Sequence, residues 1–156
     1  MRKLTARRRG NTVVEFVLSF FLIFTAFTGT FQFGYSFYTY NVLVNAVHSG
    51  ARFASLQPYD SATATPTASY RTAVQNVVVY GVPDPPTGAI PMVNGLTREH
   101  VILAITPGLS GTITVPAQVT VSISGFTINA VFQQFLLTSR PAATFVYAGL
   151  LTPPLT

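Results

Sequence analysis

Residues 16–51 contain no Asp, Glu, Lys or Arg. A helix crosses the hydrocarbon core of a bilayer with about 20 predominantly apolar residues, so this stretch is long enough to span a membrane and continue beyond it. A soluble helix of this length would show a polar stripe before residue 40, and none is present. The stretch therefore predicts a membrane-spanning helix.

The basic residues lie mostly in front of this helix. Five of the nine precede Gly10, whereas all four acidic residues follow it, so the chain after Gly10 carries four charges of each sign. The positive-inside rule then places the N-terminus in the cytoplasm and the rest of the chain outside. The four remaining cations are scattered, and we expect no nucleic-acid partner because phosphate binding needs clustered basic residues.

Glu15 stands at the entrance to the apolar stretch, shortly after Gly10. A charged residue in a membrane-inserted helix costs about 2.5 to 3.5 kcal/mol, so we expect this carboxylate to have a task. No small-residue cleavage site of the secretory type follows the apolar stretch. The small residue precedes it instead, which predicts a basic leader that ends at Gly10.

Cleavage after Gly10 would create a new α-amine on Asn11. Glu15 lies four residues further on and shares a helix face with Asn11, so its carboxylate can approach this amine or that of a staggered neighbouring subunit. Because an unpaired buried carboxylate is costly, such pairing would select the axial register between subunits. The alternative role is a favourable interaction with the helix dipole at the level of the lipid headgroups.

The sequence GNTVVEF, followed by the apolar stretch, resembles the leader and N-terminal helix of type IV prepilins. The later segment NVLVNAVHSGARFASL is similar to the continuation of this helix in TadE-like pseudopilins, the minor pilins of tight-adherence (Flp-type) pilus systems. Residues 75–81 also resemble their mid-chain segment. Phe16 follows Glu15 where the Flp-type major pilins usually carry tyrosine, which favours the pseudopilin class.

This resemblance implies cleavage after Gly10 by a membrane-embedded prepilin peptidase, with Glu15 as the carboxylate typical of the family. It also implies a place in the bacterial inner membrane, with the C-terminal domain in the periplasm. The implied partners are the lipid bilayer, the prepilin peptidase, other pseudopilins, the major pilin and the inner-membrane platform of the pilus. No cofactor is implied.

The helix is expected to continue outside the membrane to about residue 56. Its polar residues fall on one stripe, and small or apolar residues fall on the opposite one, where the C-terminal domain can approach the backbone closely. We take Ala46, Gly50 and Ala54 as the helix-packing residues. Several Thr and Gly residues between Thr25 and Gly34 are poor helix formers in water, so we expect a kink or a locally stretched turn there.

The remaining chain predicts a pilin-like α+β fold, in which the long transmembrane and stalk helix packs on a small antiparallel sheet. We expect a loop, a short helix that ends at Gly81, and a proline-rich loop. The valine-rich end of this helix could instead be strand, and residues 126–137 stay ambiguous between strand and helix. Alternating apolar residues predict three strands, and Pro153 and Pro154 are expected to end the fold. The predicted elements are the loops 57–69 and 82–88, the helix 70–80, and strands near 101–105, 119–123 and 142–148.

We divide the chain into a leader (1–10), a transmembrane and stalk helix (11–56) and one extracytoplasmic domain (57–156). The chain has no cysteine. The groups that could act in catalysis or bind a metal show no recognised spacing, and we expect Glu99 and His100 on opposite faces of a strand. These groups are His48, Asp60, Asp84, Glu99 and His100. We therefore predict neither an enzyme nor a metal site.

Two functional readings remain. The favoured one is a cleaved pseudopilin that takes part in assembling a tight-adherence pilus. The alternative is an uncleaved single-pass membrane anchor whose outer domain binds a ligand or an envelope component.

Overall fold

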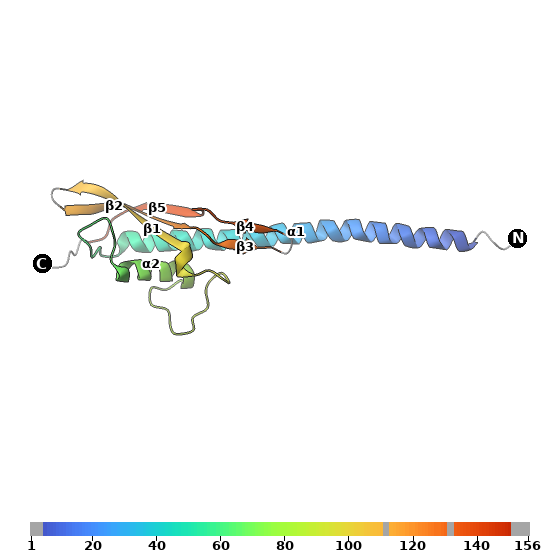
Figure 1. Cartoon of the computed structure of the whole chain (residues 1–156), viewed down its shortest axis with the longest axis horizontal. Helices are drawn as coiled ribbons and strands as arrows, with labels where there is room; N and C mark the ends of the chain where they lie inside the picture. Colours follow the sequence, from blue (N-terminus) through green and yellow to red (C-terminus); the bar gives the residue numbers. More distant parts are fainter. Residues whose placement is uncertain (1–4, 111–112, 131–132, 151–156) are drawn as a thin grey trace.

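The computed structural model describes residues 5–110, 113–130 and 133–150. One helix, α1 (Thr5–Leu56), runs along almost the whole molecule. All other described elements gather around its C-terminal half, and its N-terminal half projects as a bare rod (Figure 1). This is the α+β arrangement of a long apolar helix and a small antiparallel sheet that the sequence predicts.

Helix α1 is unbroken over its 52 residues and shows no sharp bend in Figure 1, unlike the kink or locally stretched turn expected between Thr25 and Gly34. The hydroxyls of Thr25, Thr28 and Thr30 donate to the carbonyl oxygens of Phe21, Phe24 and Ala26 at 2.7 to 3.0 Å. Each hydroxyl is thereby satisfied within the helix, one turn back, and does not compete for other partners. The helix also begins before Asn11 and passes through Gly10 without interruption.

The short helix α2 (Ala68–Tyr80) confirms the predicted helix and its C-terminal cap. Gly81 adopts the left-handed conformation, with φ of 82°, and its N–H donates to the carbonyl of Val77. At the other end, the Thr67 side chain accepts a hydrogen bond from the backbone of Tyr70. The helix begins two residues inside the predicted loop 57–69, because Thr67 provides this cap.

Three strands form the predicted antiparallel sheet in the order β1 (Val101–Ser110), β2 (Ile113–Ile123) and β5 (Ala142–Val146). The central strand β2 places Val121 between Leu103 of β1 and Ala143 of β5. Strands β2 and β5 contact α1, and α2 packs along another side of the same helix (Figure 1). Pro153 and Pro154 lie outside the described residues.

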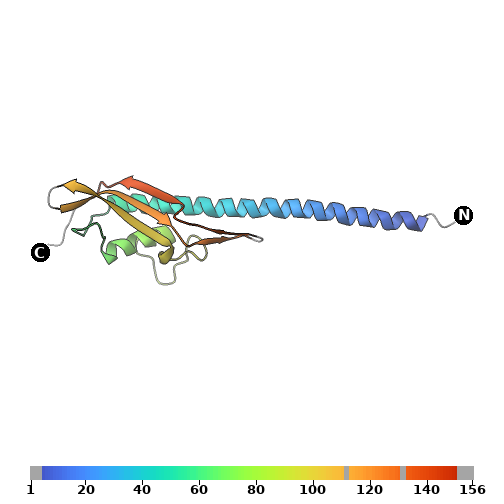
Figure 2. The same ribbon diagram turned by 45° about the horizontal axis from the view of Figure 1, so that its top comes forward.

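A second hairpin resolves the ambiguity at residues 126–137 in favour of strand. Strands β3 (Thr127–Asn129) and β4 (Gln134–Leu136) pair antiparallel and reach along α1 toward its N-terminus, beyond the three-stranded sheet (Figure 2).

Residues 98–100 contradict the sequence prediction, because they form the 3-10 helix η1 (Arg98–His100) and not a strand. Glu99 and His100 therefore do not alternate across a sheet. The turn is stabilised by the His100 side chain, whose Nδ1 accepts a hydrogen bond from the backbone N–H of Thr97 at 3.1 Å. This local contact favours a helical turn at residues 98–100, and the strand begins only at Val101.

The core forms where the outer half of α1 meets α2 and the sheet. One side of α1 is buried here, with Val74 and Val78 of α2 and Val119 and Val121 of β2 in the same cluster. The buried apolar residues of α1, together with its buried glycine, are Leu43, Ala46, Val47, Gly50, Ala51 and Ala54. The opposite stripe of Asn41, Asn45, His48 and Arg52 is exposed. The C-terminal domain thus packs on the small-residue side of α1, as the sequence predicts.

Gly50 marks the closest approach of α1 and α2, since a Cβ atom there would overlap Cγ2 of Val78. We expect Gly50→Ala to lower the free energy of unfolding by about 1 to 3 kcal/mol through overpacking. The roughly 1 kcal/mol by which alanine favours a helix offsets part of this loss, and the same gain applies to a control substitution in the same helix. Gly29→Ala is the matched control, because a Cβ atom at Gly29 would meet nothing within 4 Å. Chemical unfolding of the full chain in detergent, followed by tyrosine fluorescence, would show the difference; equal stabilities would contradict the close packing.

Tyrosines complete the C-terminal end of α1, which has no basic residue in its last turn. Pro58 has no N–H to offer the carbonyl of Ala54, and the Tyr70 hydroxyl donates to that carbonyl instead. The Tyr147 hydroxyl donates to the carbonyl of Gln57 at 2.8 Å. Tyr59 is fully buried and makes edge-to-face contacts with both rings at centroid distances of 5.5 and 6.2 Å. The three tyrosines thus connect α1 to α2 and to the chain after β5.

Removal of the Tyr70 hydroxyl leaves the buried Ala54 carbonyl without a partner. We expect Tyr70→Phe to cost about 1 to 3 kcal/mol in unfolding free energy. The exposed Tyr38 provides the control, because Tyr38→Phe should change stability little. Unfolding in detergent would measure both, and an unchanged Tyr70→Phe variant would contradict the capping role.

Burial raises the pKa of the Tyr70 phenol well above its ordinary value of about 10. Below about pH 10 the phenol is neutral in both the folded and unfolded states, so its stabilising contribution is complete. Above this pH the unfolded state ionises first, and stability falls. We expect the alkaline loss of stability to be steeper in the native chain than in Tyr70→Phe. Unfolding titrations from pH 8 to 11 would test this; parallel curves would contradict it.

Candidate functional site

The N-terminal segment with Gly10, Asn11, Glu15 and Phe16 lies on the bare part of α1, far from the folded domain. Asn11, Glu15 and Phe16 are all exposed. Asn11 and Glu15 are one helical turn apart on the same face, as their spacing predicts. A carboxylate in this position is open to a partner that comes from outside the chain.

Phe16, Phe20 and Phe24 follow one another at intervals of four residues and form a row along one face of the helix. Phe16 and Phe20 stack at a centroid distance of 6.3 Å, and Phe20 and Phe24 stack at 6.0 Å. From Asn11 to Phe27, every residue is exposed. Within the part of the chain that the structure describes, a single helix (Asn11–Leu56) is long and apolar enough to cross a membrane. Such a surface needs lipid or other apolar helices around it.

The predicted packing residues Ala46, Gly50 and Ala54 lie at the other end of α1. They are buried under the chain's own α2 and sheet. At 1.5 Å per residue they stand roughly 50 Å from Glu15. The structure thus separates the predicted site residues into an exposed group that is open to partners and a buried group that is occupied by the domain itself.

Two of the titratable groups considered from sequence, Asp60 and His48, contact other side chains in the described structure. Asp60 accepts hydrogen bonds from the hydroxyls of Thr67 and Ser69 in front of α2. The rings of His48 and Phe145 lie edge to face at a centroid distance of 6.2 Å. Among the described residues, no group of three or more His, Cys, Asp or Glu side chains could hold a metal ion.

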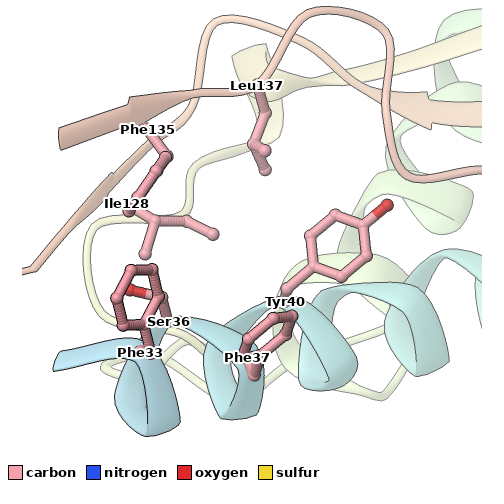
Figure 3. A pocket seen from close by; sticks show the side chains of 7 residues that line it. All are labelled: Phe33, Ser36, Phe37, Tyr40, Ile128, Phe135 and Leu137. Carbon is pink, nitrogen blue, oxygen red and sulfur yellow. The ribbon is translucent and has the colours of Figure 1, made fainter. Parts of the chain in front are cut away.

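One feature was not found from sequence: an apolar groove between α1 and the β3–β4 hairpin (Figure 3). It has a volume of about 350 Å³. Residues from both elements line it: Phe33, Ser36, Phe37, Tyr40, Ile128, Phe135 and Leu137. The alternation of Phe126 with Ile128 and of Phe135 with Leu137 was a usable signal for the hairpin. The partner surface on α1 had no local signature.

Comparison with known families gives a match for the first third of the chain. Residues 10–52 match the family model described as TadE-like protein. The N-terminal segment is TadE-like. No curated protein and no solved structure matches the chain. The TadE-like match begins at Gly10, includes Glu15, and ends within the stripe on which the domain packs.

A TadE-like segment on a helix of membrane-spanning length fits a membrane-anchored protein related to pili. The TadE-like family is not a family of enzymes.

Proposed function

We propose that this protein is a minor pilin, or pseudopilin, of a tight-adherence pilus. In this proposal a prepilin peptidase removes residues 1–10, and the processed subunit takes part in pilus assembly from the bacterial inner membrane. The observation that carries the proposal is the TadE-like match that starts at Gly10, on a helix whose first half is bare and apolar.

The exposed half of α1 supports a role in assembly. Its phenylalanines can face lipid before assembly and other pilin helices after it, because both environments are apolar. The small-residue stripe around Gly50 is not available for this purpose, since α2 already covers it. Contacts with other pseudopilins, the major pilin and the inner-membrane platform therefore fall to the inner half of the helix and to the outside of the domain.

Glu15 has a defined task in this scheme. After cleavage, the α-amine of Asn11 carries a positive charge at neutral pH, since its reference pKa is about 8. Glu15 is exposed one turn away, so its carboxylate can pair with this amine or with that of a neighbouring subunit. Pairing lowers the cost of burying both charges among apolar helices, and subunit registers that allow it are favoured.

The first prediction from this proposal concerns processing. Protein recovered from membranes of a host with its matching peptidase should begin at Asn11, as intact mass and N-terminal sequencing would show. We expect Gly10→Leu to keep residues 1–10, because a bulky side chain replaces the small residue at the cleavage position. A start at Met1 in both proteins would refute cleavage and favour the alternative reading, a permanent membrane anchor with a ligand- or envelope-binding domain.

The second prediction concerns Glu15. We expect Glu15→Gln to insert into the membrane and be cleaved normally, yet to be lost from complexes with other pilins, because the amide cannot pair with an α-ammonium group as an ion. Glu99→Gln is the matched control, since Glu99 is an exposed acid in the outer domain. Quantitative mass spectrometry of sheared pili and of crosslinked membrane complexes provides the measurement. Normal recovery of Glu15→Gln in these complexes would rule out the registration role.

A further inference from the structure

The β3–β4 hairpin is the part of the outer domain that lies nearest to the N-terminal end of α1. Figures 1 and 2 both show it reaching along the helix past the three-stranded sheet. The pairing of Ile128 with Phe135 places these side chains on one face of the hairpin. The hydrogen bond from the N–H of Leu137 to the carbonyl of Phe126 extends the ladder toward the domain.

This face of the hairpin does not close fully onto α1. Ile128, Phe135 and Leu137 approach Phe33 and Tyr40 across the open apolar groove seen in Figure 3. A second hollow continues from it along the helix. Gln133 of the hairpin and Phe33, Gln32 and Gly29 of α1 line this hollow, which extends down to Phe24 and Phe21 on the bare surface. The groove is thus continuous with the apolar surface that faces the membrane.

The level of the hairpin can be compared with the thickness of a bilayer. A hydrocarbon core of about 30 Å takes about 20 helical residues. If the core begins at Asn11 it ends near Thr30, and if it begins at Phe16 it ends near Tyr35. The hairpin residue Gln133 lines the same hollow as Gly29 and Gln32, and Gln32 is only 8% exposed. For either start, the end of the hairpin lies at or inside the outer boundary of the core.

The aromatic residues of α1 mark the same level. Tyr35 and Tyr38 are exposed, and Tyr40 lines the groove. Tyrosines are enriched where the membrane meets water, because the ring is apolar and the hydroxyl is polar. The groove therefore lies beside the residues that favour the outer interface.

The far side of the hairpin has a composition suited to this interface. Leu136 is 65% exposed, and its neighbours Asn129 and Gln134 are exposed polar residues. The structure shows β3 and β4 paired with each other, in a sheet of two strands. Its outer edges present backbone groups that need water or headgroups, so the hairpin suits the interfacial layer and not the centre of the bilayer.

From these observations we propose that the β3–β4 hairpin is a second membrane contact, embedded in the outer interfacial layer. Acyl chains of the surrounding phospholipids fill the groove between the hairpin and α1. The inference rests on the membrane-spanning role proposed for α1, but not on cleavage or on pilus assembly. It means that the outer domain is held at a defined height and orientation on the bilayer.

The absence of cysteine allows this to be tested with single labels. The full chain would carry an NBD fluorophore on a cysteine at Leu136 or at Ser36, which lines the groove. Each protein is placed as a single copy in nanodiscs of phosphatidylethanolamine and phosphatidylglycerol, with nitroxides near the headgroup end of the acyl chains for the labels at Leu136, Ser36 and Val146, with nitroxides near the terminal methyl as well for the label at Phe21, or with no nitroxide. We expect the nitroxide lipids to quench the labels at Leu136 and Ser36.

Two further labels provide the controls. Phe21 is 66% exposed on the spanning part of α1 and should be quenched. Val146 is 72% exposed in β5. It lies between Phe145, whose ring contacts that of His48, and Ala148, whose N–H donates to the carbonyl of Ser55, so it stands about 20 to 30 Å above Tyr35 and should not be quenched. Circular dichroism would confirm that each labelled protein is folded.

The outcomes separate the two proposals. If the label at Phe21 is quenched but the label at Leu136 or the label at Ser36 is not, the hairpin contact is overturned and the spanning helix is left in place. The absence of quenching at Phe21 overturns the spanning role and, with it, the hairpin contact. A second comparison uses nanodiscs that hold two copies of the chain. If the Ser36 label is quenched in discs with one copy but protected in discs with two, a neighbouring subunit occupies the groove, and lipid is overturned as its occupant.

Discussion

The structure depends on the close packing of the outer half of α1 against α2. Gly50 has no Cβ, and the side chain of Val78 occupies the space that a Cβ would need. Ala46 and Ala54 stand one turn away on either side and are buried in the same interface. Because small residues let the two backbones approach, the valines of α2 and β2 can complete a core around a helix that is otherwise built for an apolar solvent.

This packing lets one helix serve two environments. Below the domain, large phenylalanines point outward and nothing in the described chain covers them. At the level of the domain, small residues of α1 face α2 and the sheet, and the domain packs on them. The transition takes place at Gln32 to Tyr40, where the hairpin lies beside α1 and leaves the open groove. The tyrosines at the far end of α1 then satisfy the carbonyl groups that the helix itself cannot pair.

The TadE-like match and the structure concern different parts of this arrangement. The match covers residues 10–52, which are the helix with its leader glycine and Glu15. The structure adds the hairpin and the tyrosine cluster, which lie beyond the matched residues. It also adds the groove, which the hairpin forms with the matched part of α1. Assembly is therefore proposed from the inner half of α1, whereas the position of the domain on the bilayer is proposed from the hairpin.

Local and periodic signals in the sequence determined much of the fold. The uncharged stretch predicted α1, the stripe of Ala46, Gly50 and Ala54 showed where the domain packs, and Gly81 marked the end of α2, because each of these depends on residues within a few turns. Neither the 3-10 helix at Arg98 nor the unbroken course of α1 past Thr25 was predicted. A hydrogen bond from the Thr97 N–H to the His100 side chain decides the first. In the second, the Thr25 hydroxyl finds its partner inside the helix, and the helix continues past it. The groove and the contact of Tyr70 with Ala54 join residues that are distant along the chain. Only the tertiary structure decided these, because such contacts leave no local pattern in either partner.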